Sequence, residues 1–80
     1  MKLLKLEKYN CPSCVKVSNV LNAMGVNYDQ INVEDDPEVA GKYNIMSVPV
    51  TILEDNEGNE LQRSIGYRPE ELEEMISKLI

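Results

Sequence analysis

The sequence has no histidine, tryptophan or phenylalanine, and its 80 residues include only two cysteines, Cys11 and Cys14. A structural zinc site needs four ligands, which are mostly cysteine and histidine side chains. One copy of this chain therefore cannot build such a site from thiolates and imidazoles. Long apolar runs are also missing, and the longest is far too short to span a bilayer. We expect no membrane association.

Basic residues are scarce: eight Lys and Arg stand against fourteen Asp and Glu, for a net charge of −6. Proteins that bind nucleic acid need a basic face, so this balance argues against that class. The cations are unevenly placed, because residues 1–16 hold four lysines and one glutamate. Both cysteines lie in this basic stretch, with Lys8 and Lys16 nearest in sequence. Positive charge nearby favours a thiolate, although the lysines could equally be solvated.

The remaining composition, 42% hydrophobic and 28% charged, is that of a globular protein. The length predicts one domain over residues 1–80, with a small core. Glu7 and Lys8 interrupt the first apolar segment before a secretory signal could form, so we expect a cytoplasmic protein. In a reducing cytoplasm, a cysteine pair is more often catalytic than structural.

Hydrophobic patterning predicts a strand, a helix and a second strand in the first half of the chain. The first strand, over residues 3–8, is expected to be central because its apolar positions do not alternate cleanly. A helix is predicted over residues 12–24, since Pro12 suits a first turn and Gly25 a C-terminal stop. Residues 26–33 predict the second strand, which completes a parallel crossover. The helix has an apolar stripe consisting of Val17, Val20, Leu21 and Met24.

The second half predicts a short helix, a hairpin and a final helix. An acidic start ahead of Pro37 predicts the short helix over residues 37–43. Residues 50–53 and 61–65 predict an antiparallel hairpin. The final helix is predicted to begin at Pro69, with a buried stripe consisting of Leu72, Met75, Ile76 and Leu79.

The two cysteines stand three residues apart at the start of the first predicted helix. A lone Cys-x-x-Cys serves as half of a zinc site or as a redox pair, and beside a βαβ pattern it is typical of thioredoxin-like redox motifs. The positive end of the helix dipole and the unpaired N–H groups of the first turn favour a thiolate on Cys11. Cys14, one turn further in, lies closer to the core. We predict that both are catalytic, with Cys11 attacking and Cys14 resolving.

Three separated segments together resemble the thioredoxin superfamily in its small, glutaredoxin-sized form: residues 11–14 (Cys-Pro-Ser-Cys), residues 43–49, and residues 66–69 (Gly-Tyr-Arg-Pro). The resemblance covers nearly the whole chain. It implies an α/β fold of order βαβαββα, whose four-stranded mixed sheet has the order 4-3-1-2 with strand 3 antiparallel. It also implies that Pro49 follows a cis peptide bond and faces the cysteines. The substrate-binding residues that it implies are Pro12, Ser13, Val48, Pro49, Gly66 and Tyr67.

Within the superfamily the chain has mixed features. Pro12, directly after the first cysteine, is similar to glutaredoxins, whereas residues 45–49 and 69–72 are similar to thioredoxins. Residues 66–69 together with residues 31–34 (Ile-Asn-Val-Glu) resemble the NrdH-redoxins, which act as donors to ribonucleotide reductase. Where thioredoxins keep a buried aspartate in the strand before their motif, this chain has Lys5 and Glu7.

The function that the resemblance implies is a thiol-disulfide oxidoreductase that reduces protein disulfides, with ribonucleotide reductase as one candidate target. The electron donor would be thioredoxin reductase or glutathione. The sulfurs carry both electrons, so no cofactor or metal is needed, and we expect a monomer.

Other readings stay open at this point. Two chains that each supply Cys11 and Cys14 could hold zinc or an iron–sulfur cluster. The fold could serve as a redox-inert binding module, because fold does not dictate function. The cysteines could also be two unrelated buried thiols, and Pro49 could be a strand-start proline with no chemical role.

Overall fold

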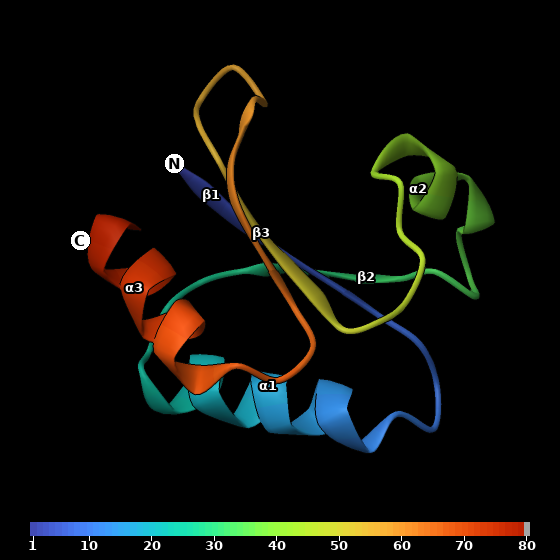
Figure 1. The fold of residues 1–80 in the computed structure, drawn as a ribbon, viewed down its shortest axis with the longest axis horizontal. Coiled ribbons are helices and arrows are strands. Elements are labelled where there is room, and N and C mark those ends of the chain that lie inside the picture. Colours follow the sequence, from blue (N-terminus) through green and yellow to red (C-terminus); the bar gives the residue numbers. More distant parts are fainter. Residues whose placement is uncertain (80) are drawn as a thin grey trace.

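The computed structural model describes residues 1–79, so that Ile80, the last residue of the expected domain, lies outside the described residues. Strands and helices follow in the order βαβαββα (Figure 1). Their bounds are β1 (Lys2–Glu7), α1 (Pro12–Ala23), β2 (Asp29–Asn32), α2 (Pro37–Lys42), β3 (Val50–Glu54), β4 (Glu60–Ile65) and α3 (Pro69–Leu79). None of these helices is both long and apolar enough to cross a membrane within the described part of the chain.

The four strands form one mixed sheet in the order β2-β1-β3-β4. The first two strands pair in parallel, whereas β3 is antiparallel to both β1 and β4. The predicted fold class and strand order are thus confirmed. β1 lies inside the sheet, as its sequence predicts, and residues 3–6 are all buried. A strand that is covered on both faces needs no alternation of apolar and polar residues.

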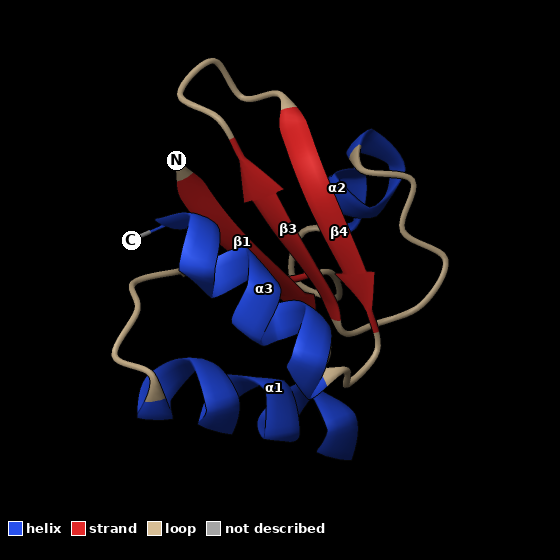
Figure 2. Cartoon of the chain, turned by 60° about the vertical axis from the view of Figure 1, so that its left-hand side comes forward, coloured by secondary structure: helices blue, strands red, loops and turns tan. Residues whose placement is uncertain are grey.

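Helices cover both faces of the sheet. In Figure 2, α1 and α3 lie together on one side and α2 lies behind the strands. Successive residues of β1 point to opposite faces, so Leu3 joins the core beneath α1 and α3 while Leu4 joins the core beneath α2. The first core consists of Leu3, Val17, Leu21, Leu53, Leu72, Met75 and Ile76. The second consists of Leu4, Leu6, Val50 and Ile52.

Two predicted details were wrong. Met24 does not belong to the apolar stripe: it follows the last turn of α1 and is 46% exposed. β2 has only four residues, because it is an edge strand and Val26 packs against the core from a loop instead. The acidic start predicted for α2 is confirmed, since Asp36 is its N-cap residue ahead of Pro37, although the Asp36 side chain makes no capping hydrogen bond.

The contrast between Leu21 and Met24 can be tested by stability. Leu21 is fully buried between helix and sheet, so Leu21→Ala is expected to lower the free energy of unfolding by about 2–5 kcal/mol through lost burial and a cavity. Met24→Ala, three residues along and half exposed, is expected to change it by less than about 0.5 kcal/mol. Urea unfolding of both variants measures the difference. Equal losses would show that Met24 is part of the core.

Candidate functional site

Cys11 and Cys14 form a disulfide at the start of α1, with their Cα atoms 5.2 Å apart. Asn10 turns the chain from β1 into the helix with a positive φ of 54°, a conformation that asparagine tolerates better than most residues. Cys11 is the N-cap residue, in extended backbone, and Pro12 occupies the first helical position. There the missing N–H of proline costs nothing, because it would have no partner inside the helix.

The Cys11 sulfur occupies the position of a helix-capping acceptor. The backbone N–H of Cys14 donates to Cys11 Sγ over 3.2 Å. The hydroxyl of Ser13 lies 3.6 Å from the same sulfur. Donors directed at Cys11 in the disulfide are also placed to stabilise a thiolate there after reduction.

Exposure hardly distinguishes the two cysteines, since Cys11 is 8% exposed and Cys14 is 3% exposed. Their difference lies in their place on α1. Cys11 precedes the helix and caps it, whereas Cys14 belongs to its first turn. Any chemical asymmetry between the sulfurs therefore comes mainly from hydrogen bonding and from nearby charge.

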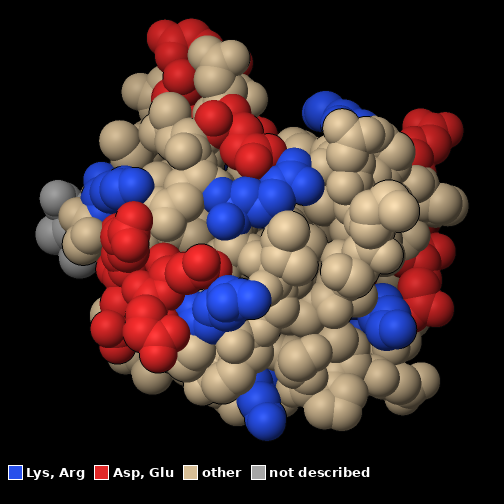
Figure 3. All heavy atoms as spheres, in the orientation of Figure 1, with Lys and Arg blue, Asp and Glu red and all other residues tan. Residues whose placement is uncertain are grey.

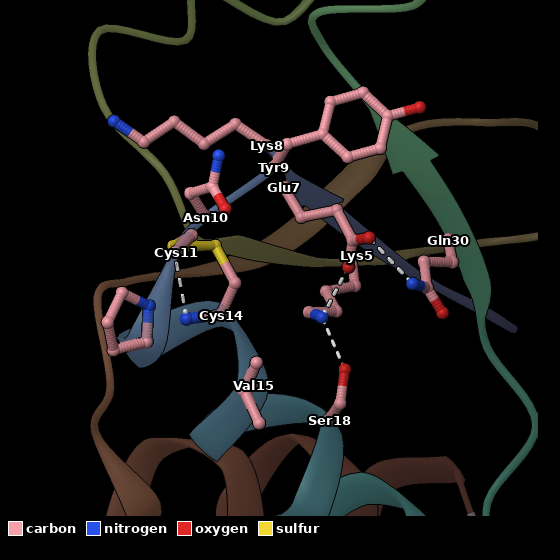
Figure 4. A pocket seen from close by; sticks show the side chains of 11 residues that line it. Lys5, Glu7, Lys8, Tyr9, Asn10, Cys11, Cys14, Val15, Ser18 and Gln30 are labelled. Atoms are coloured by element: carbon pink, nitrogen blue, oxygen red, sulfur yellow. Dashed lines mark hydrogen bonds and ion pairs between the residues drawn. A yellow bond between two sulfur atoms is a disulfide. The ribbon is translucent and has the colours of Figure 1, made fainter.

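An open cleft of about 620 Å³ lies beside the disulfide, between the end of β1, the start of α1 and β2. Figure 4 shows Lys5, Glu7 and Ser18 on the inner side of this cleft, with hydrogen bonds linking them. Lys8 also lines it. Lys16, in contrast, lies with its ammonium 5.8 Å from the centre of the Tyr67 ring, within range of a cation–π interaction.

Pro49 lies at the same end of the sheet as the cysteines. Val50 pairs with Leu6, the residue one position before the end of β1, and also with Ile65 of β4. The Val48–Pro49 peptide bond is cis. The carbonyl of Pro49 accepts a hydrogen bond of 2.8 Å from the backbone N–H of Gly66. The loops that precede β3 and follow β4 are thereby joined.

The predicted substrate-binding residues reach this end of the molecule from three segments. Pro12 is exposed and Ser13 half-buried, both beside the disulfide. Val48 is half-buried next to the buried Pro49. Gly66 adopts a φ of 85°, which favours glycine, and Tyr67 is 41% exposed and reaches α1 through Lys16.

Tyr9 fixes the turn that carries the cysteines. Its backbone N–H donates to Glu34 and its phenol donates to Asp35, each over 2.7 Å. The hydrogen bond to Asp35 raises the pKa of Tyr9. Because Glu34 and Asp35 follow β2, these contacts tie the approach to Cys11 to the neighbouring strand.

Sequence reasoning noted Lys5 and Glu7 where thioredoxins keep a buried aspartate, but it did not include Lys5 among the site residues. It lies in the middle of an apolar strand and is only 1% exposed. The signal was present, because a lysine between leucines with an acidic residue two positions later places opposite charges on one face of a strand. Among the described residues, no group of three or more His, Cys, Asp or Glu side chains is placed to hold a metal ion.

Figure 3 shows how charge is distributed over one face of the molecule. Acidic side chains gather on the left, where Figure 1 places α3, and at the top, at the turn between β3 and β4. The lower right, where α1 begins, is largely uncharged. The large apolar or aromatic residues exposed on the turn, helix and loops around the site include Tyr9, Val15, Met46 and Tyr67.

Comparisons with known proteins agree with this geometry. A family model described as Glutaredoxin matches residues 5–57. The chain is 43% identical over 79 residues to the SPbeta prophage-derived thioredoxin-like protein YosR of Bacillus subtilis, covering 99% of each chain. It is 34% identical over 77 residues to a thioredoxin of Listeria monocytogenes, covering 88% of this chain and 74% of that one. The crystal structure of thioredoxin NaTrxh from Nicotiana alata matches with a TM-score of 0.83 and 27% identity, covering 95% of this chain and 70% of that one.

Proposed function

This chain belongs to the glutaredoxin-like proteins of the thioredoxin superfamily, and from that premise we propose that it reduces disulfides in other proteins by dithiol exchange. The observation that carries the proposal is the Cys11–Cys14 disulfide at the start of α1. Cys11 Sγ accepts a hydrogen bond from the helix, so its thiolate is the better stabilised of the two. Cys11 is therefore the attacking sulfur and Cys14 the resolving one.

The reaction has two exchange steps. The Cys11 thiolate attacks one sulfur of the partner's disulfide, which forms a mixed disulfide and releases the partner's other sulfur as a thiolate. Cys14, as a thiolate, then attacks Cys11 Sγ. The Cys11–Cys14 bond forms, the bond to the partner breaks, and the partner leaves with two thiols after taking up protons from water. Two electrons pass from the cysteine pair to the partner.

The segment before β3 is suited to hold an extended substrate. In the described chain, the backbone of Val48 makes no hydrogen bond with another backbone group. Its N–H and C=O can therefore pair with a substrate strand, as in β-augmentation. Pro49 follows directly, and its carbonyl is already occupied by Gly66. Pro12, Ser13 and Tyr67 would contact the partner's residues around its disulfide.

The surface around the disulfide favours a protein partner. Met46 is 97% exposed and Val15 is 58% exposed, and neither apolar side chain is covered in this structure. Val15 lines the cleft beside the disulfide, and Met46 lies near Val48 and Lys8. Exposed apolar residues beside a reactive group and beside a substrate-binding segment suit a protein contact site.

Residues 66–69, which resemble NrdH-redoxins, lie beside α1 through the contact of Tyr67 with Lys16. They support ribonucleotide reductase as a candidate target. On this proposal the protein acts in the cytoplasm, as a monomer of one domain.

The roles of the two cysteines are tested by single substitutions. Cys11→Ser is expected to abolish reduction of insulin disulfides, because the attacking sulfur is gone. Cys14→Ser is expected to stop turnover at the mixed disulfide, so that mass spectrometry finds the partner covalently bound to Cys11. The control is Ser77→Ala, a surface change on α3. Full activity of the Cys11→Ser variant would show that the nucleophile is misassigned.

The acidity of Cys11 can be measured separately. In the Cys14→Ser variant, Cys11 is the only thiol, and its ultraviolet thiolate absorbance reports its ionisation alone. Helix N-termini lower thiol pKa values from about 8.5 into the range of about 3.5–7.5. We expect the Cys11 titration to have its midpoint in that range. A midpoint at or above the ordinary value would remove the physical basis for its attacking role.

The electron donor is tested by supplying each candidate alone. We expect thioredoxin reductase with NADPH to reduce the oxidised protein, because the exposed apolar side chains of Val15 and Met46 suit contact with a protein donor. Glutathione with glutathione reductase is expected to react more slowly. NADPH consumption measures both rates, with the Cys11→Ser variant as the blank. A faster reaction with glutathione would assign the protein to the glutathione-dependent route instead.

A further inference from the structure

Lys5 is a buried cation in the cleft beside the disulfide. Its side chain is 1% exposed, and a lysine is almost never so deeply buried unless it is paired. Leu3 packs beneath α1 and α3, and the side chains of a strand repeat their direction every two residues. Lys5 and Glu7 therefore point to the side of the sheet on which α1 lies. The cysteines belong to the start of that same helix.

The hydrogen bonds of Lys5 leave part of its donor capacity unused. Its ammonium donates to a carboxylate oxygen of Glu7 and to the hydroxyl of Ser18 (Figure 4). An ammonium has three N–H bonds, and the described residues give this one two acceptors. The third N–H is held inside a cleft that Cys11 and Cys14 also line.

Glu7 has both of its carboxylate oxygens occupied in this cleft. One of its oxygens accepts from Lys5, and the other accepts from the amide of Gln30 over 2.6 Å. Both oxygens of Glu7 thus already accept a hydrogen bond. Glu7 is also 15% exposed in its side chain, whereas Lys5 is almost completely enclosed. The less screened charge of the pair is therefore the positive one.

Other charges that face the cleft are weaker influences. The end of β1 and the turn after it contribute Lys8 and Tyr9, which are both exposed and screened by solvent. From α1 come the two cysteines and the neutral Ser18, and from β2 the neutral Gln30. Within the described residues, Lys5 is the one deeply buried charge that lines the cleft.

We propose that Lys5 acts on the resolving cysteine: its ammonium, held by Glu7 and Ser18, donates to the Cys14 sulfur once the disulfide is reduced and favours the Cys14 thiolate. This inference rests on the proposed function. In the mixed disulfide, Cys14 releases its proton to water through the open cleft, and Lys5 keeps its own protons. The Cys14 thiolate then attacks Cys11 Sγ, and the partner's sulfur leaves with the bonding electron pair. Lys5 thus stabilises the attacking thiolate without exchanging a proton.

The test measures the ionisation of Cys14 alone. In the Cys11→Ser background, Cys14 is the only thiol, and its thiolate absorbance is followed against pH. Adding Lys5→Met removes the cation and leaves the Glu7 carboxylate, so the midpoint is expected to rise by about one pH unit or more. Adding Glu7→Gln leaves the cation without its counter-charge, so the midpoint is expected to fall. Lys2→Met, an exposed lysine on the same strand, is the matched control and is expected to leave the midpoint unchanged.

Opposite shifts in the two variants are the signature of an electrostatic contact, because a merely structural disturbance would not reverse sign with the charge removed. An unchanged midpoint in Lys5→Met, or shifts in the same direction in both variants, would overturn the inference. If Lys5→Met fails to fold, Glu7→Gln decides alone, and a rise there overturns it. Normal disulfide reduction with unchanged titrations would sink the role of Lys5 only. The expected titrations in a wild-type protein that reduces no disulfide would sink the proposed function and leave the contact between Lys5 and Cys14 standing.

Discussion

The hydrogen bond from the Cys14 N–H to Cys11 Sγ is the contact on which the site depends, because it makes a sulfur the cap of a helix. A capping acceptor must stay where the helix begins, so the helix itself has to be held in place. Val17 and Leu21 supply this, since both are fully buried against the sheet and α3. The reactive end of α1 is thus positioned by packing one and two turns away from the disulfide.

The same strand that supports α1 also brings charge to it. In β1, the side chains of Leu4 and Leu6 point to the core beneath α2. Those of Leu3, Lys5 and Glu7 point to the opposite face, on which α1 lies. Near the N-terminal end of β1 this face is purely apolar. Toward the carboxyl end of β1, where the chain turns into the cysteine motif, this face carries the ion pair between Lys5 and Glu7. On β1, the charged side chains of this face thus lie at the end that leads into the cysteine motif.

Much of this arrangement can be read from the sequence, and the failures have physical causes. The predicted bounds of α1 are right to within one residue because burial of one helix face determines its pattern. Those of β3 are right to within one residue because a short apolar run that is covered on both faces follows Pro49. Met24 continued the helical spacing but not the helix, since the chain turns at Gly25 before another turn can reach the core. The sequence places Lys5 and Glu7 where thioredoxins keep a buried aspartate, but it does not show what these side chains contact. Only the three-dimensional pairing with Glu7 and Ser18 shows how the cation is accommodated.

The four lysines of residues 1–16 have different surroundings in the structure, which net charge alone does not show. They are neither uniformly solvated nor uniformly directed at the cysteines. Lys2 pairs with Asp29 at the edge of the sheet, Lys5 with Glu7 inside the cleft, and Lys16 lies over Tyr67. Only Lys8 lines the cleft without an ion pair among the described residues, and it is exposed to solvent. The basic stretch therefore contributes to the site through one buried cation and one aromatic contact, while the ionisation of Cys11 depends chiefly on the helix that it caps.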